Sequence, residues 1–223
     1  MRIIISENTL NNNFLSNFKN WFANSKVVDK NGNPMVCYHG TRKGGFLEFK
    51  PKEGYKGHSK QQLDLGSHFS IDKEYSKTYA GDGKNAKVYE CFLRIQNPLE
   101  TNIIVYREDD ETKFHLYFNF TKKVFGKKMR VSGDDFYNKN GEKMGIPQNI
   151  MINSFLIDSI PSGNLYNGLK NFGFDGVFHT PYNRESITHF KSHPLAYVVL
   201  DANQIKSTEN DGSFDIDDNN IYS

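Results

Sequence analysis

The sequence predicts a single α+β domain. Its 223 residues fit one domain, and an apolar content of 37%, with many aromatic residues, is enough to form a core. The β-prone runs occur in clusters and do not alternate one by one with helices, which favours α+β over a doubly wound parallel sheet. We expect a domain at residues 26–208, an N-terminal helical arm at 1–25 packed on its core, and a flexible acidic tail at 209–223.

The arm is predicted to form one amphipathic helix. Its apolar residues recur at intervals of three and four, which places them on a single face that packs on the core. They are Phe14, Leu15, Phe18, Trp21 and Phe22. After the arm, Asp29–Pro34 is a turn cluster between the β-prone runs Lys26–Val28 and Met35–Tyr38, which predicts a hairpin.

A strand and a helix are predicted next. Leu65–Phe69 has the composition of a strand, and Ser70 is a suitable cap for a helix over Ile71–Tyr79. Asp72 and Glu74 fall in the first turn of this helix, where the helix dipole favours negative charge.

The middle of the chain is predicted to be rich in strands. Lys87–Ile95 forms one, and Asn102–Arg107 and Lys113–Phe120 follow. The last run alternates, so that its apolar residues share one face of a strand. They are Phe114, Leu116, Phe118 and Phe120. Residues 121–148 are basic, glycine-rich and weakly patterned, and we expect an insertion at about 100–148.

The C-terminal half is predicted to contain two helices and two strands. The helices are Asn149–Ile160 and Leu165–Phe172. A turn at Gly173 leads into a strand that ends at Phe178, a loop covers 179–194, and Tyr197–Leu200 forms the last strand.

Composition narrows the class of protein. No apolar run approaches the roughly 20 residues of a membrane span, so we expect no membrane partner. Cys37 and Cys91 lie in strand-like runs and are interpreted as buried free thiols, which favours a cytoplasmic location. Cys37, His39, His58 and His68 do not have the spacing of zinc ligands, so we expect no metal site.

The first candidate site is the segment Val36–Thr41, where an apolar run delivers a histidine to a glycine-containing turn. Gly40 has no side chain, so a flat ligand can approach the backbone, and the peptide groups here can bond a carboxamide such as that of nicotinamide. His39 can hydrogen-bond a ribose hydroxyl. A packed core histidine is the structural alternative.

The second candidate site is Leu65–Ser70 with the helix after it. This segment presents His68 beside Phe69. Ser76 and Tyr79 are three residues apart and therefore share one face of the helix. The structural alternative for Tyr79 is a core aromatic residue.

These two motifs, in this order, resemble the NAD-binding half of the ADP-ribosyltransferase fold shared by diphtheria-type toxins and poly(ADP-ribose) polymerases. Further segments are similar to phage-borne members of the superfamily, including those embedded in polyvalent proteins. They are Phe18–Phe22, Ser25–Asp29, Gly173–Gly176 and Ala196–Ser207. The segments cover most of residues 14–214 and leave 100–150 unmatched.

The resemblance implies a split barrel of two small antiparallel sheets with flanking helices around a cleft for NAD+, the co-substrate. In the implied reaction, a nucleophile of the target attacks the anomeric carbon of NAD+ and releases nicotinamide. The residues implied to hold NAD+ are His39, Gly40, Thr41, Phe69, Ser76 and Tyr79. Tyr79 would stack on the nicotinamide ring and Ser76 would bond its amide. His68 would line the pocket where polymerase-like members carry a tyrosine, which implies single transfer (mono-ADP-ribosylation).

Ala196 departs from the resemblance. The family has a glutamate there, which stabilises the positively charged transition state. Three explanations stand: a substitution that disables a toxic enzyme, a natural protein that binds NAD+ without using it, or replacement by another acid such as Glu185. We prefer the first, because the surroundings of Ala196 otherwise match.

The resemblance leaves the target open. A toxin, phage effector or phage-defence component is implied, with a macromolecular acceptor (RNA, DNA or protein) and an antitoxin or inhibitor as a possible partner. The basic, aromatic segment Lys113–Arg130 could contact a nucleic-acid backbone, and a solvated hairpin is the alternative. The rival function is a non-catalytic module that binds NAD+ or a partner on the same fold.

Overall fold

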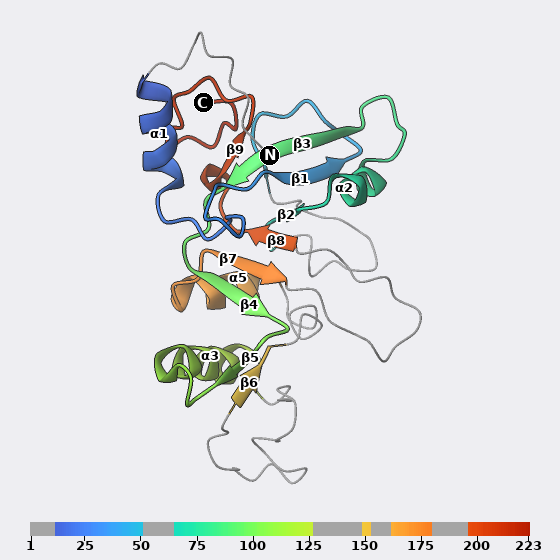
Figure 1. Ribbon diagram of the computed structural model, residues 1–223. Helices are drawn as coiled ribbons and strands as arrows, with labels where there is room; N and C mark the ends of the chain where they lie inside the picture. The colour runs from blue at the N-terminus through green and yellow to red at the C-terminus, as the bar shows by residue number, and fades with distance from the viewer. Residues whose placement is uncertain (1–11, 51–64, 127–148, 153–161, 180–195) are drawn as a thin grey trace. The chain divides into compact units, whose positions relative to one another are not determined.

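The structure, a computed structural model, comprises two compact units (Figure 1). The residues it describes are 12–50, 65–126, 149–152, 162–179 and 196–223. The first unit comprises Met1–Lys50, Phe69–Gln96 and Asp201–Ser223, and the second comprises Pro51–His68 and Asn97–Leu200. Each unit contains both helices and strands, so the predicted α+β class is confirmed.

The strands of the first unit run in the order β2-β1-β3-β9. β1 (Cys37–Thr41) is antiparallel to β3 (Lys87–Leu93) along its whole length, and β3 is antiparallel to β9 (Ile205–Ser207). β2 (Ser67–Ser70) pairs with β1 through Tyr38 and Ser70. The boundary between the two units falls within this strand, between His68 and Phe69. The strands expected near β2 and β3 are confirmed with small shifts at their ends, while β9 was not predicted.

The helix after β2 is confirmed, but its cap differs. α2 (Lys73–Ala80) begins after Asp72, whose carboxylate accepts a hydrogen bond from the Tyr75 amide at 3.0 Å. The hydroxyl of Ser70, the expected cap, instead accepts a hydrogen bond from the Asp72 amide. Aspartate caps as well as serine does, so composition alone could not choose between them.

α1 (Asn12–Phe22) confirms the predicted amphipathic helix, but Leu15, which was expected on its core face, is exposed. Its aromatic face packs in a buried cluster with residues from β3 and the C-terminal segment. The buried members are Phe18, Trp21, Phe22, Phe92 and Phe214. The Trp21 indole also donates a hydrogen bond to the carbonyl of Asn203 at 3.1 Å.

The C-terminal segment differs from the expected flexible tail. Phe214 and Ile221 are buried, and the Ile221 amide donates a hydrogen bond to the Leu47 carbonyl. The fully buried Lys206 ammonium of β9 donates to the carbonyl oxygens of Asp218 and Asn220, at 3.0 and 2.9 Å. The many Asp and Asn residues of the C-terminal segment indicated a solvated tail. In the structure their side chains accept hydrogen bonds from nearby backbone amides in tight turns.

The turn at residues 29–34 is confirmed, but the hairpin around it is reduced to one bridge. The Asp29 carboxylate accepts hydrogen bonds from the amides of Asn31 and Asn33. Only Val28 and Pro34 then pair across the turn. β1 begins after this turn and finds its partners in β2 and β3.

The second unit contains two groups of strands. β7 (Gly176–His179) lies between β4 (Pro98–Thr101), to which it is parallel, and β8 (Ala196–Val199), to which it is antiparallel. β5 (Ile104–Tyr106) and β6 (Asn149–Met151) form a separate antiparallel pair. The resemblance implied two purely antiparallel sheets, but the β4–β7 pair is parallel. It also implied a split barrel, but the strands of the described residues do not close into a barrel.

α3 (Glu111–Val124) replaces the strand predicted at Lys113–Phe120. The Asp110 carboxylate caps it by accepting a hydrogen bond from the Lys113 amide at 2.8 Å. Phe114, Tyr117 and Phe120 are buried at a spacing of three, which is helical. The prediction was wrong because Tyr117 lies between Leu116 and Phe118, so the apolar residues of this run fit helical spacing as well as the alternation of a strand.

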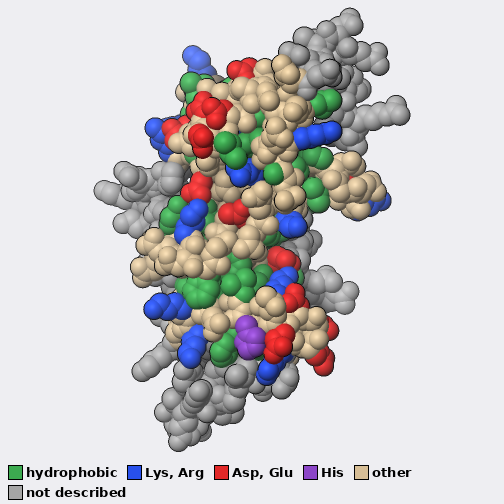
Figure 2. All heavy atoms as spheres, turned by 90° about the vertical axis from the view of Figure 1, so that its left-hand side faces the viewer, with side chains coloured by type: hydrophobic (Ala, Val, Ile, Leu, Met, Phe, Trp, Pro, Cys, Tyr) green, Lys and Arg blue, Asp and Glu red, His purple; other side chains and the backbone are tan. Residues whose placement is uncertain are grey.

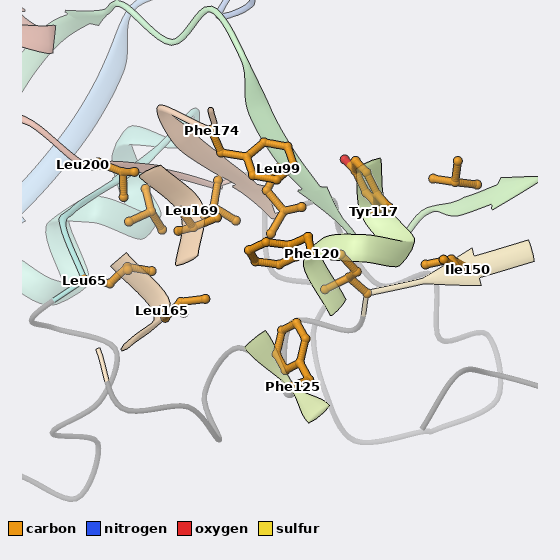
Figure 3. Close-up of a cluster of buried hydrophobic side chains, with 14 of the residues drawn as sticks. Leu65, Leu99, Tyr117, Phe120, Phe125, Ile150, Leu165, Leu169, Phe174 and Leu200 are labelled. Atoms are coloured by element: carbon orange, nitrogen blue, oxygen red, sulfur yellow. The ribbon is translucent and has the colours of Figure 1, made fainter. Parts of the chain in front are cut away.

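The core of the second unit joins α3 to β4, β6 and α5 (Ser162–Asn171), as the buried side chains in Figure 3 show. Leu99 of β4, Ile150 of β6 and Leu169 of α5 are fully buried there with Phe120. Residues 100–126, which fall within the expected insertion, thus supply part of this core, while the rest of that insertion, 127–148, lies outside the described residues.

The remaining predictions for this unit have mixed outcomes. α5 confirms the helix at Leu165–Phe172, and β7 and β8 confirm the last two strands. The helix predicted from Asn149 is wrong at its start, where β6 forms, and residues 153–161 lie outside the described residues. The loop predicted at 179–194 also lies almost entirely outside them.

Candidate active site

The first part of the candidate site is the contact between β1 and α2. A Cβ atom at Gly40 would stand 1.8 Å from the carbonyl oxygen of Ser76 and 3.0 Å from the amide nitrogen of Ala80. Only glycine lets the helix approach the strand so closely. The glycine was predicted to admit a ligand, and in the structure it admits α2, which carries Ser76 to the strand beside His39.

Ser76 and Tyr79 occupy different environments on α2. Ser76 is buried, and its hydroxyl donates a hydrogen bond to the carbonyl of Tyr38 at 3.1 Å. Tyr79 is 57% exposed, so it is not the core aromatic residue that the structural alternative required. Its hydroxyl lies 2.8 Å from that of Tyr75, with the two rings edge to face. Because the Tyr79 ring is exposed and contacts Tyr75 edge to face, one of its faces is available for a planar ligand to stack on.

Aromatic rings surround His39. Its ring centroid lies 4.9 Å from that of Phe49 and 5.5 Å from that of Phe69. The half-buried His39 ring is thus packed against two aromatic side chains. Thr41, at the end of β1, is buried, and its hydroxyl accepts a hydrogen bond from the Lys43 amide at 3.3 Å.

The second part of the candidate site is a row of residues across β4, β7 and β8. Thr101, His179 and Ala196 are successive partners in register, so their side chains emerge on the same face. Nδ1 of His179 lies 3.1 Å from the hydroxyl of Thr101. Burial, and secondarily the nearby His68, lower the pKa of His179 to about 4, which keeps the ring neutral at pH 7.

The structure therefore groups the predicted site residues in two sets. His39, Gly40, Thr41, Phe69, Ser76 and Tyr79 belong to the first unit. His68 and Ala196 belong to the second unit. Sequence reasoning missed Thr101 and His179. The signal was present: His179 directly follows the predicted strand ending at Phe178, and this strand precedes Ala196 in the chain.

The described part of the basic segment near Lys113 forms a helix, so the solvated hairpin given as the alternative is wrong there. Lys122 and Lys123 are exposed at the end of α3, and Lys113 pairs with Glu100 at 2.8 Å. Blue basic and red acidic side chains are interspersed on the face drawn in Figure 2. The described residues thus carry only part of the predicted basic cluster. Lys127, Lys128, Arg130 and Glu185 lie outside them.

Two further expectations concern metals and membranes. Among the described residues, no three His, Cys, Asp or Glu side chains are grouped as a metal ion requires. None of the helices described has the length and apolar character needed to cross a membrane.

The two sets of residues lie in a part of the chain whose sequence is that of an ADP-ribosyltransferase domain. The sequence model of one family, described as ADP-ribosyltransferase in polyvalent proteins, matches residues 29–214. Because the match covers most of the chain, the chain belongs to this family, as its motifs predicted. Searches of curated proteins and of solved structures gave no match.

Proposed function

We propose that this chain is an NAD+-binding mono-ADP-ribosyltransferase domain whose transfer step is disabled by alanine at position 196. The observation that carries the proposal is the family match, which spans His39, Ser76 and Ala196 together. Enzymes of this class use NAD+ as the donor of ADP-ribose. The acceptor is a macromolecule, either a nucleic acid or a protein.

The geometry of the first unit supports NAD+ binding. His39 is packed against its aromatic neighbours, Ser76 is buried beside β1, and Tyr79 offers an exposed ring. These are the groups needed to bond a ribose hydroxyl, to contact a carboxamide and to stack on a pyridinium ring. None of them requires a carboxylate at position 196, so binding is retained without catalysis.

The second unit supports the loss of catalysis. Ala196 is the first residue of β8, and its methyl group cannot stabilise positive charge. Removing one preorganised protein group that stabilises the charge of a transition state lowers the reaction rate by a factor on the order of 10²–10³. We therefore expect NAD+ turnover to be slower by that factor than in an Ala196→Glu variant.

The test compares the chain with Ala196→Glu and with the neutral control Ala196→Gln. NAD+ consumption and the transfer of labelled ADP-ribose into a cell lysate are measured for all three. Activity in the glutamate variant alone supports a disabled transferase. NAD+ binding without turnover in every variant would instead support the rival function, a non-catalytic module.

The same labelled lysate identifies the acceptor. Label that nuclease removes and protease leaves marks a nucleic acid, and the reverse marks a protein. An intact transferase of this kind would act as a toxin or effector in the cytoplasm, with an inhibitor protein as its partner. If expression of the glutamate variant does not slow growth of the host cell, the toxin role is wrong.

A further inference from the structure

Tyr89 of β3 is the direct cross-strand partner of His39, so the two side chains lie on the same face of the sheet in the first unit. The hydroxyl of the buried Tyr89 accepts hydrogen bonds from the backbone amides of Gly45 and Phe46, at 2.8 and 3.2 Å. The Phe46 ring also stacks on the Tyr89 ring, with the two centroids 4.5 Å apart. Tyr89 therefore anchors the start of the segment Gly45–Phe49 to β3.

The same segment is anchored a second time, by the C-terminal part of the first unit. The amide of the buried Ile221 donates a hydrogen bond to the carbonyl of Leu47 at 2.8 Å. The carbonyl of Ile221 in turn accepts a hydrogen bond from the amide of Ser207, in β9, at 2.7 Å. Because both bonds are made by the backbone, the path of residues 45–49 is set by two strands of one sheet.

The segment ends at Phe49, which packs on the imidazole of His39. The two rings are nearly perpendicular, at 87°, and their centroids are 4.9 Å apart. Phe49 also lies 5.2 Å from Phe69 and 5.6 Å from Tyr89, measured between ring centroids. Phe49 and Phe69 are both buried. Rotation of the imidazole about its Cα–Cβ bond would have to displace one of these rings, which close packing resists.

We propose that Tyr89 is a positioning residue for His39. Its hydroxyl anchors the segment that carries Phe49, and Phe49 holds the imidazole in one rotamer before NAD+ binds. The inference rests on the proposed function, in which His39 bonds a ribose hydroxyl. A side chain that already has its bound rotamer lowers the entropy cost of binding. Loss of this order should weaken NAD+ binding about 3–10-fold.

The experiment is a double-mutant cycle read by equilibrium binding of NAD+. Tyr89→Phe removes the hydroxyl and keeps the ring, and His39→Ala should by itself weaken binding about 5–10-fold. Tyr89→Phe should weaken binding about 3–10-fold when His39 is present. In the His39→Ala background it should weaken binding less than about 2-fold, because Tyr89 acts through His39. Equal losses in both backgrounds would show that Tyr89 supports only the fold, and would overturn the inference.

Tyr117→Phe is the matched control in the second unit. Tyr117 is also a buried tyrosine whose hydroxyl accepts a hydrogen bond from a backbone amide, that of Glu100, at 2.7 Å. Its loss should lower the stability of the fold and leave the affinity for NAD+ unchanged. If Tyr117→Phe weakens NAD+ binding as much as Tyr89→Phe does, the loss is general destabilisation and the inference is wrong.

A spectroscopic measurement tests the same inference without any ligand. Three-bond coupling constants of the His39 side chain report the populations of its rotamers in solution. We expect one rotamer in the unaltered chain and averaging over several in Tyr89→Phe. Averaged couplings in the unaltered chain would overturn the inference whatever the binding data show.

The outcomes also distinguish this inference from the proposed function. If the chain binds NAD+ and Tyr89→Phe binds it equally tightly, the inference fails and the function stands. If neither the chain nor Ala196→Glu binds NAD+, the proposed function fails and the inference fails with it.

Discussion

The backbone of Ser76 occupies the space that a side chain at Gly40 would need. The strand carrying His39 and the helix carrying Ser76 therefore meet at van der Waals distance, backbone against backbone. The contact couples the stability of the first unit to the geometry of its candidate site, since any residue larger than glycine must push α2 away from β1.

Gly40→Ala should accordingly destabilise the chain by about 3 kcal/mol, because overpacking against rigid backbone is costly. Denaturant unfolding measures this effect. Gly83→Ala is the matched control: nothing lies within 4 Å of its added methyl group, so its stability should change by less than about 0.5 kcal/mol. Equal effects of the two substitutions would contradict the close contact.

His179 should make stability depend on pH. The folded state holds its pKa at about 4, below the usual 6.5, so between these values the unfolded chain binds a proton that the folded chain does not. Stability therefore falls as pH drops from 6.5 towards 4, by up to about 3 kcal/mol from this group. His179→Gln should remove that part of the slope in unfolding curves measured across the window. An unchanged slope would mean that the ring is not buried as a neutral group.

Cys37 and Cys91 face each other across β1 and β3 and are both buried. Burial raises the pKa of both thiols, so neither is a thiolate near neutral pH. We expect iodoacetamide to modify both in the denatured chain and neither in the folded chain within an hour at pH 8. Mass spectrometry reads the modification, and rapid labelling of the native protein would contradict the assignment.

Lys206 should hold the C-terminal segment in place. Lys206→Met keeps most of the apolar volume but leaves the carbonyls of Asp218 and Asn220 without their donor, at a cost of about 2–4 kcal/mol. Hydrogen exchange should rise in residues 210–222 of this variant. Lys122→Met, on the exposed end of α3, is the control and should leave exchange there unaltered.

Local signals in the sequence were sufficient for the elements of the candidate site. The spacing of apolar residues located α1 and α5. The β-prone run at Met35–Tyr38 located the start of β1, which continues through Gly40 to Thr41, where a turn was predicted. Ser76 and Tyr79 fell on one helix as their spacing required. These features depend on neighbours in the chain, which is why sequence patterns report them.

Contacts distant in the chain were not predictable in the same way. The apolar residues of the run at 113–120 fit both the alternation of a strand and the spacing of a helix, and packing against α5 and β6 favours the helix. Lys206 was indistinguishable from a surface lysine until the C-terminal segment folded over it. The link from Thr101 to His179 joins residues 78 apart in sequence, and only the pairing of β4 with β7 creates it.

The chain contains a single tryptophan, and the aromatic cluster around it lies wholly in the first unit. Fluorescence excited selectively at tryptophan therefore reports the unfolding of one unit only, whereas far-ultraviolet circular dichroism reports both. Coincident transitions from the two signals would mark the molecule as one cooperative body. Separate transitions would show that the unit bearing His39 can melt while the unit bearing His179 stays folded.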